Sequence, residues 1–504
     1  MRIKLFLTFI KSVLLFRRFV KKNLFYEKYG KKNDNLICIL IQPWYGQAVP
    51  WISIVLALAL YKNNNIIILF NDLFSYRGRK SYILFLFEKF FIKYVLLLIA
   101  DKFEYICLSE CTGGVISALD KKFVLSCIDL NSIHYSRGES SFIKRKDFKN
   151  DVERKYQRVY LAASKFFEDN KITKLVMPGG IWGVTKVIRH LGELSGAKTM
   201  CFDGGDQSVL FSTVGPASQQ KDIQVAFKEI LSNVDETDYA ILKGKQKVEE
   251  RMSGEDPDLF YIVKNSASFD SEDYFLIMLN VVWDGAALDL HVVYRNMTDW
   301  ILDTIHWVLD NTNKTVVIRQ HPGERASYIR SSDDYQAIIS DAFGDDARVV
   351  FISSFSNIDA YHLIESSNCV IGFSSSALVE AVTMGKPTLI VSEAYFSDLN
   401  IVYKSNNKKQ YYQYLSLANT YRLPVTQEMK NNALVCNYLT QTRNRLLSGF
   451  TTDDVNSWVN LDMQSLTSVH IIVEAIEKLE PVSLICHRKS YKVYKKSGFG
   501  DDLK

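Results

Sequence analysis

Residues 369–381 read CVIGFSSSALVEA, and this stretch decides the fold class. Its β-prone apolar run, its turn of small residues and the helix formers after it predict a strand, a turn and the start of a helix. The first N–H groups of a helix have no intrahelical partner, so a phosphate suits such a turn. The hydroxyls of Ser374, Ser375 and Ser376 add donors, and the Glu380 carboxylate can accept from ribose hydroxyls. The alternative is that the serines only cap the helix.

Outward from this stretch, short apolar runs alternate with helical patterns in both directions. The second half predicts strands at Tyr274–Val282, Thr315–Arg319, Arg348–Ile352, Cys369–Ile371 and Thr388–Val391, and helices at Met297–Asn311, Ala360–Ser366 and Ala377–Met384. The first half predicts strands at Leu36–Ile41, Ile66–Phe70, Lys174–Met177 and Lys198–Phe202. Such alternation is typical of parallel strands joined by crossover helices. The sequence therefore predicts an α/β protein with two Rossmann-like domains that face a central cleft, where a ligand binds.

A length of 504 residues suits two domains with connecting segments. A polar, helical stretch divides the two alternating series, so we expect a domain boundary there. The predicted segments are a basic N-terminal helix (1–32), a first Rossmann-like domain (33–215), a helical connector (216–272), a second Rossmann-like domain (273–480) and a basic tail (481–504). The helical pattern after Leu466 is expected to close the second domain, and the basic end is expected to be loosely ordered.

Charge is nearly balanced, with 61 basic and 56 acidic residues, which argues against a general nucleic-acid binder. Residues 1–32 nevertheless carry ten Lys or Arg and one acidic residue, Glu27. Lys11 interrupts the apolar run, so neither a secretory signal nor a spanning helix fits. A basic amphipathic helix on an anionic membrane surface fits, as does a helix packed on the protein with a solvated basic face. The apolar run Tyr82–Ala100 contains three charged residues and predicts a buried or lipid-touching helix.

The segment TVVIRQHPGE, residues 315–324, ends a predicted strand in an ionisable cluster. In such sheets, ligands bind at the carboxyl ends of the strands. Pro322 disfavours helical backbone at His321, so the imidazole stays beyond the strand tip. Arg319 and His321 are two residues apart and share a face of the chain. Beside a turn suited to phosphate, this pair favours ligand binding over a purely structural role.

These two segments, preceded by the strand Tyr274–Val282, resemble the capsular polysaccharide biosynthesis glycosyltransferases and the related GT-B sialyltransferases and Kdo transferases. The likeness covers about the second half of the chain. It implies a GT-B fold and a nucleotide-sugar donor bound by residues at the matching positions: Arg319, His321, Pro322, Ser374, Ser375, Glu380, Lys386 and Pro387. The stretch LNVVWD, residues 279–284, is similar to the loop that opens the family's second domain, which adds Asn280 and Asp284 to the donor site. Asn280 replaces the more usual Gln.

Related enzymes place a general base at a strand end in the first domain, often in an Asp-Gly turn. The stretch CFDGGD, residues 201–206, resembles it, which makes Asp203 the expected base and Asp206 and Asp284 its rivals. Such a base accepts the proton of the acceptor hydroxyl during attack on the anomeric carbon. The alternative for each is a loop carboxylate that caps or is solvated. Residues 42–46 (QPWYG) either line the acceptor side with aromatic surface or form a packed turn.

The predicted function is transfer of a hexosyl, sialyl or Kdo-type sugar to a growing surface polysaccharide, at the inner face of the bacterial plasma membrane. Its partners would be the nucleotide-sugar donor, a lipid-linked or polysaccharide acceptor and the membrane surface, with no nucleic acid. No cofactor or metal is predicted, because the close pair Cys107 and Cys111 lacks further ligands and no convincing Asp-x-Asp motif is present. The alternatives are a polyol-phosphate transferase of the teichoic-acid type, a sugar-nucleotide epimerase and a non-catalytic binding subunit.

Overall fold

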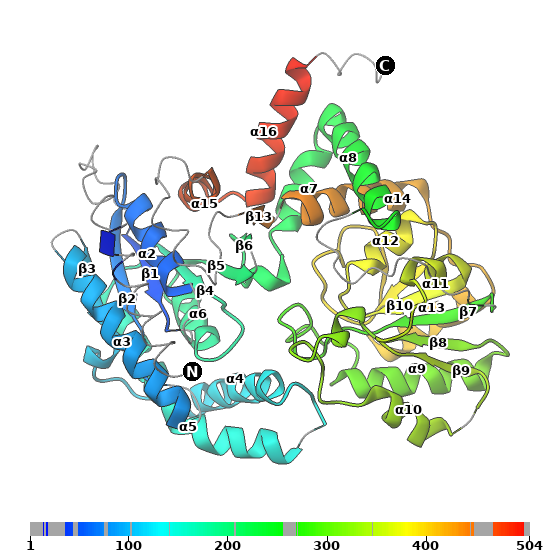
Figure 1. Cartoon of the computed structure of the whole chain (residues 1–504), viewed down its shortest axis with the longest axis horizontal. Helices are drawn as coiled ribbons and strands as arrows, with labels where there is room; N and C mark the ends of the chain where they lie inside the picture. The colour runs from blue at the N-terminus through cyan, green and yellow to red at the C-terminus, as the bar shows by residue number, and fades with distance from the viewer. Residues whose placement is uncertain are drawn as a thin grey trace. The chain divides into compact units, whose positions relative to one another are not determined.

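The chain forms two α/β units (Figure 1). The computed structural model describes residues 14, 17–18, 36–43, 49–74, 79–100, 103–140, 142–205, 208–255, 269, 271–344, 346–443, 445–447 and 467–497. The described residues of Met1–Ser132, Lys146–Asp222 and Asn444–Cys486 form unit 1, and those of Ile133–Arg145, Ile223–Arg443 and His487–Lys504 form unit 2.

Unit 1 is built on a seven-stranded sheet with the order β13-β6-β5-β4-β1-β2-β3. Its strands are β1 (Leu36–Ile41), β2 (Asn65–Phe70), β3 (Glu104–Cys107), β4 (Lys174–Pro178), β5 (Lys198–Gly205), β6 (Ser208–Ser212) and β13 (Arg445–Leu447). Neighbouring strands from β3 to β5 run parallel, whereas β6 is antiparallel to both β5 and β13. The parallel part has the strand order 3-2-1-4-5, which is typical of a Rossmann fold.

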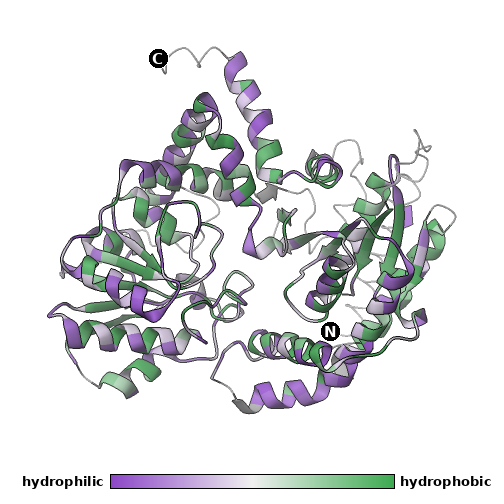
Figure 2. Ribbon diagram, turned by 180° about the vertical axis from the view of Figure 1, so that it is seen from behind, coloured by the Kyte–Doolittle hydropathy of each residue, from purple (hydrophilic) through white to green (hydrophobic). Residues whose placement is uncertain are grey.

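Helices cover both faces of this sheet because successive side chains of a strand point to opposite sides. Ile37, Ile39 and Ile41 of β1 lie in one core, with α2 (Val49–Leu60), α3 (Arg79–Ile99) and α15 (Thr467–Lys478). Cys38 and Leu40 lie in the opposite core, with α4 (Ala118–Ser136), α5 (Phe142–Asp169) and α6 (Thr185–Leu194). The strands are accordingly hydrophobic on both faces, as Figure 2 shows by their green colour.

Unit 2 has a six-stranded, wholly parallel sheet with the order β12-β11-β10-β7-β8-β9. Its strands are β7 (Tyr274–Met278), β8 (Val316–Arg319), β9 (Val349–Ile352), β10 (Ser367–Gly372), β11 (Thr388–Ile390) and β12 (Tyr403–Lys404). Read from β9, the order is 3-2-1-4-5-6 within the unit. The order reverses between β7 and β10, where α/β sheets open a crevice for ligands.

Some helices of unit 2 pack on its sheet, and others lie away from it (Figure 1). The helices of this unit are α7 (Ile223–Leu231), α8 (Val234–Met252), α9 (Met297–Asn311), α10 (Tyr335–Phe343), α11 (Ala360–Ser366), α12 (Ala377–Thr383), α13 (Lys408–Asn419) and α14 (Gln427–Asn437). Helix α16 (Val482–Lys496) begins in unit 1 and belongs to unit 2 from His487 onward. Helices α9, α10 and α13 share one core with the strands. Helix α8 packs against α14, and a Cβ atom at Gly244 would overlap the Leu434 carbonyl, so this close approach needs glycine.

The two Rossmann-like units confirm the predicted α/β fold class, but the expected segment boundaries differ from the units. Residues Ile133–Arg145, expected in the first domain, belong to unit 2. The stretch expected as a connector holds α7 and α8, which belong to unit 2. The helix expected to close the second domain, α15, buries Val469, Ile472 and Ile476 in the core of unit 1 instead. The end expected to be loosely ordered forms α16 up to Lys496. Apolar spacing identified these helices, but it does not say which sheet they cover.

The proposed N-terminal helix (1–32) lies outside the described residues, apart from Leu14, Arg17 and Arg18. Trp44, Tyr45 and Gly46 of the expected acceptor surface and the rival base Asp206 lie outside them as well. Among the residues that the structure describes, no helix is long and apolar enough to cross a membrane.

Candidate functional site

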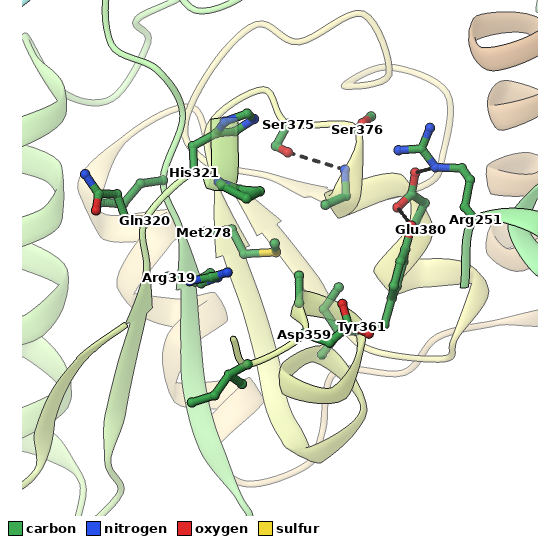
Figure 3. Close-up of a pocket in the computed structure, with 16 residues that line it drawn as sticks. Arg251, Met278, Arg319, Gln320, His321, Asp359, Tyr361, Ser375, Ser376 and Glu380 are labelled. Carbon is green, nitrogen blue, oxygen red and sulfur yellow. Dashed lines mark hydrogen bonds and ion pairs between the residues drawn. The ribbon is translucent and has the colours of Figure 1, made fainter. Parts of the chain in front are cut away.

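A pocket opens in unit 2 at the carboxyl ends of β7, β8 and β10, where the strand order reverses (Figure 3). Its polar lining residues are Arg251, Arg319, Gln320, His321, Asp359, Tyr361, Ser375, Ser376 and Glu380. Its apolar lining residues are Met278, Leu279, Pro322, Ile358, Ala360, Ile364 and Ala377. The tip of β8 and the turn after β10, which the sequence proposed as one anion site, therefore line the same pocket.

Arg319 is the last residue of β8, and its side chain is only 2% exposed. One terminal nitrogen, Nη1, donates to the carbonyl of Ser353. The Nε atom is buried and has no hydrogen-bond partner among the described residues. Burial and the nearby Arg325 lower the pKa of Arg319 to about 10, so the guanidinium stays cationic at neutral pH. The pocket thus contains a buried positive charge with an unused donor, which is costly without an anionic partner.

His321 follows Arg319 on the same face of the chain and lines the pocket. Its Nδ1 accepts a hydrogen bond from the backbone N–H of Gly323 (3.1 Å), in the short turn that Pro322 begins. Burial and the charge of Arg319 lower the pKa of His321 to about 4. The imidazole is therefore neutral at pH 7, and because Nδ1 is the acceptor, Nε2 carries the hydrogen.

Glu380 lies in α12 and is buried at the opposite side of the pocket from Arg319 (Figure 3). Its Oε1 forms an ion pair with Nε of Arg251 (2.9 Å), from the last turn of α8. Its Oε2 accepts a hydrogen bond from the hydroxyl of Tyr361 (2.8 Å). The arginine keeps the carboxylate charged inside the protein, and the two contacts fix its orientation.

The three serines after β10 have different surroundings. Ser375 and Ser376 line the pocket, and Ser375 Oγ accepts a long hydrogen bond from the Ala377 N–H (3.4 Å). Ser374 is buried below them, where its hydroxyl donates to the Ala286 carbonyl (2.7 Å) and its N–H donates to Asn280 Oδ1 (3.1 Å). Asn280 and Ser374 thus brace the pocket loops against each other. Helix α12 is 7 residues long and ends one residue before the predicted end.

Two other residues proposed for donor binding lie away from the pocket lining. Asp284 is exposed and accepts a hydrogen bond from the Ala286 N–H (3.2 Å), in the loop after β7. Lys386 donates to the carbonyl of Ser367 (3.0 Å), which anchors the start of β10. These contacts are structural.

Asp203 belongs to unit 1, where it lies inside β5 and not at a strand end as expected. Strand β5 runs on to Gly205, because its second half pairs with β6, and Asp203 lies opposite Leu210. The carboxylate is half-buried, and Oδ2 accepts a hydrogen bond from the Ser218 N–H (3.2 Å). The pairing of β6 with β5 could not be predicted, because the apolar run that predicted β5 contains no local signal for an antiparallel neighbour.

The pocket residues that sequence reasoning missed include Arg251, Asp359 and Tyr361. Arg251 ends a highly charged helix, a pattern that usually marks a solvated surface. Asp359 and Tyr361 flank the start of α11, a helix that was predicted, but nothing in its sequence points to the pocket. No group of His, Cys, Asp or Glu side chains that could hold a metal ion occurs within the described residues.

No family model and no curated protein sequence matches the chain. Among solved structures, it is similar to a KpsC β-Kdo 2,7 transferase from Thermosulfurimonas dismutans, with 11% identity, a TM-score of 0.34 and coverage of 68% of this chain and 97% of that one. It is also similar to a UDP-GlcNAc 2-epimerase from Neisseria meningitidis bound to UDP-GlcNAc, with 13% identity, a TM-score of 0.26 and coverage of 79% and 96%. Likenesses this distant do not decide an activity, which has to be inferred from the pocket.

Proposed function

We propose that the chain is a glycosyltransferase that transfers a sugar from a nucleotide-activated donor to a growing surface polysaccharide. One observation carries the proposal: the pocket of unit 2 holds the buried Arg319 cation, whose Nε has no partner among the described residues. A phosphate offers several acceptor oxygens and a negative charge. It would therefore accept a hydrogen bond from Nε and compensate the charge of this guanidinium.

The remaining lining of the pocket suits a nucleoside attached to that phosphate. Met278, Ile358 and Ile364 supply an apolar wall for a base. The Glu380 carboxylate is held by Arg251 and Tyr361, but a carboxylate has about four acceptor positions and can still accept from ribose hydroxyls. We therefore assign the phosphate to the Arg319 side of the pocket and the ribose to the Glu380 side.

The chemistry requires the bond between the anomeric carbon and a phosphate oxygen to break, which leaves negative charge on the departing nucleotide. In this proposal the Arg319 cation and the Nε2–H of neutral His321 stabilise that charge, without a divalent cation. The acceptor hydroxyl must lose its proton as it attacks, and Asp203 of unit 1 is the proposed base, with Asp206 and Asp284 as rivals. The proposed acceptor is a lipid-linked saccharide at the inner membrane face.

Thermal unfolding of the full chain in the presence of nucleotides tests the pocket. Cytidine, uridine, guanosine and adenosine mono- and diphosphates are compared with inorganic phosphate and with the free nucleosides. A ligand that binds only the folded state adds about 2.7 kcal/mol of stability at a hundred times its Kd, so at least one nucleotide should raise the melting temperature. Arg319→Gln should remove most of that increase, because the phosphate loses its charged partner.

The nucleotide that binds then selects the donors for a transfer assay. Release of nucleotide that depends on an added saccharide acceptor supports a glycosyltransferase. Release with nucleotide glycerol as the donor would favour the polyol-phosphate transferase, and conversion of a sugar nucleotide without any acceptor would favour an epimerase. If no nucleotide changes the melting temperature, the proposal is wrong at its first step.

A further inference from the structure

Asp359 is an acidic residue in the lining of the pocket of unit 2, and it has no role in the chemistry proposed above. It lies between β9 and α11, as the residue directly before that helix. Figure 3 shows it at the far end of the pocket from His321 and Ser375. Together with Glu380, it adds negative charge to a pocket that is proposed to hold a phosphate. A carboxylate in such a place needs an explanation.

The wall beside Asp359 is the part of the pocket that is left for the base. Arg319 and His321 are assigned to the phosphate, and Glu380 is assigned to the ribose. The remaining wall is apolar, and one of its members, Ile358, is the chain neighbour of Asp359. A base that packs on this wall would bring its edge close to the Asp359 carboxylate.

Tyr361 links this wall to the ribose side of the pocket. Its hydroxyl donates to Oε2 of Glu380 (2.8 Å), and it follows Asp359 by two residues at the start of α11. One short stretch of chain thus carries Asp359 and fixes the carboxylate that is assigned to the ribose. Ribose and base are directly bonded in a nucleoside, so two carboxylates held by one stretch suit these two neighbouring groups.

The Asp359 carboxyl group can act as an acceptor toward a ligand. Burial raises its pKa, whereas the backbone N–H groups of Tyr361 and Ala360 and the charge of Arg319 lower it. An ionised carboxyl group offers about four acceptor positions and no hydrogen to donate. Like Glu380, it can therefore accept from a ligand in addition to its contacts within the protein.

We propose that Asp359 selects a nucleotide whose base carries an amino group at its pairing edge, and that it disfavours uridine nucleotides. This selection rests on the proposed function, since it names the class of nucleotide that binds in the same pocket. Cytosine, adenine and guanine each have an exocyclic amino group, which donates to a carboxylate. Uracil has a carbonyl oxygen where cytosine has its amino group, and two acceptors that face each other repel.

Binding of nucleoside monophosphates to the full chain, measured by calorimetry near neutral pH, tests this selection. CMP, GMP and AMP are compared with UMP at one salt concentration. At least one of the first three should bind roughly tenfold more tightly than UMP, because hydrogen bonds to a charged group are among the stronger ones. Asp359→Asn replaces one acceptor oxygen by an amino donor. It should weaken binding of that nucleotide about tenfold and strengthen binding of UMP.

The asparagine variant also separates base selection from a purely structural role at the start of α11. Asn starts helices about as well as Asp, so the melting temperature of Asp359→Asn should match the wild type. Asp334→Asn is the matched control. Asp334 starts α10 of the same unit, where it accepts a hydrogen bond from the Ala337 N–H (3.1 Å), and it is not part of the pocket lining. This control should leave every nucleotide affinity unchanged.

Opposite changes for UMP and for the amino-bearing nucleotide would support the inference, since a structural defect would weaken all nucleotides alike. Three results would overturn it and leave the proposed nucleotide pocket in place: equal wild-type affinity for all four nucleotides, tighter wild-type binding of UMP, or an equal loss for all four in Asp359→Asn. Binding of none of the four would overturn the proposed function and this inference together.

Discussion

The two units place different chemistry at the same point of nearly the same sheet. In both, the strand order reverses between the first and fourth strands of the unit, which are β1 and β4 in unit 1 and β7 and β10 in unit 2. Beyond β1, Gln42 accepts a hydrogen bond from Asn71 (2.6 Å), and Asn71 in turn accepts from the Leu73 N–H (3.2 Å). At the end of β8, Arg319 keeps a buried donor without a partner among the described residues.

The comparison shows that the topology of a sheet provides a crevice, whereas the side chains at its strand ends decide what that crevice can bind. The reversed strand order opens a crevice in either sheet. In unit 1 the polar groups at the strand ends bind one another, and Asp72 is likewise engaged by Ser109 (2.6 Å) and Lys89 (2.9 Å). In unit 2 the Arg319 guanidinium keeps a buried Nε without a hydrogen-bond partner among the described residues. We infer a division of labour in which unit 2 binds the donor and unit 1 contributes to the reaction, and four predictions test it.

The largest expected effect is on turnover. Asp203→Asn keeps an oxygen that can accept from Ser218 but removes the basic carboxylate, so we expect transfer to fall by roughly 10³-fold. Nucleotide affinity, measured by calorimetry, should stay unchanged, because the pocket lies in unit 2. Asp206→Asn and Asp284→Asn are the controls. If one of these stops transfer while Asp203→Asn does not, Asp203 loses its proposed role.

The next effect is on stability. Arg251→Met leaves the buried Glu380 carboxylate without its cation, which should cost about 3 kcal/mol in the free energy of unfolding. The double variant with Glu380→Gln should recover much of that loss, since no uncompensated charge remains. Urea unfolding of the two variants measures both values. Equal stability of Arg251→Met and wild type would mean that the ion pair does not hold the pocket together.

Glu380 could be predicted from the sequence, whereas its ion-pair partner Arg251 could not. The bounds of β1, α9 and α11 agree with their predicted ranges, because a clear apolar period ends at a cap or a turn in each. Arg319 and His321 were found because each lies within two residues of a predicted strand end, and Glu380 was found because it lies in the first turn of a predicted helix. Arg251 and Tyr361 reach the same pocket by packing between distant helices, such as α8 on α14, and no local pattern encodes such contacts.

A smaller effect is expected on nucleotide affinity, which should respond to a change in unit 2 and not to the corresponding change in unit 1. Arg319→Gln should lower nucleotide affinity about thirtyfold, because a buried charge-assisted contact to phosphate is worth about 2 kcal/mol. Gln42→Leu is the corresponding change beyond β1. It removes the Asn71 hydrogen bond and should leave nucleotide affinity at the wild-type value. A comparable loss of affinity in both variants would contradict the inference that the nucleotide binds in unit 2.

The smallest effect is a pH dependence. The pKa of His321 is lowered from 6.5 to about 4 in the folded chain, by burial and by the charge of Arg319. As the pH falls from 6.5 toward 4, the unfolded chain therefore takes up a proton that the folded chain does not, and about 1.4 kcal/mol of stability is lost for each pH unit. His321→Gln should remove this part of the dependence. Melting temperatures across that window, for both chains, provide the measurement.

The route of the chain constrains how the protein can be made. The backbone passes between the units five times, and strand β13 and helix α15 of unit 1 come from its far end. On the ribosome, the first sheet must wait for residues translated more than two hundred positions later before β13 pairs with β6 and α15 covers its apolar face. A fragment that stops at residue 222 would leave that face open to water, so we expect it to aggregate during expression.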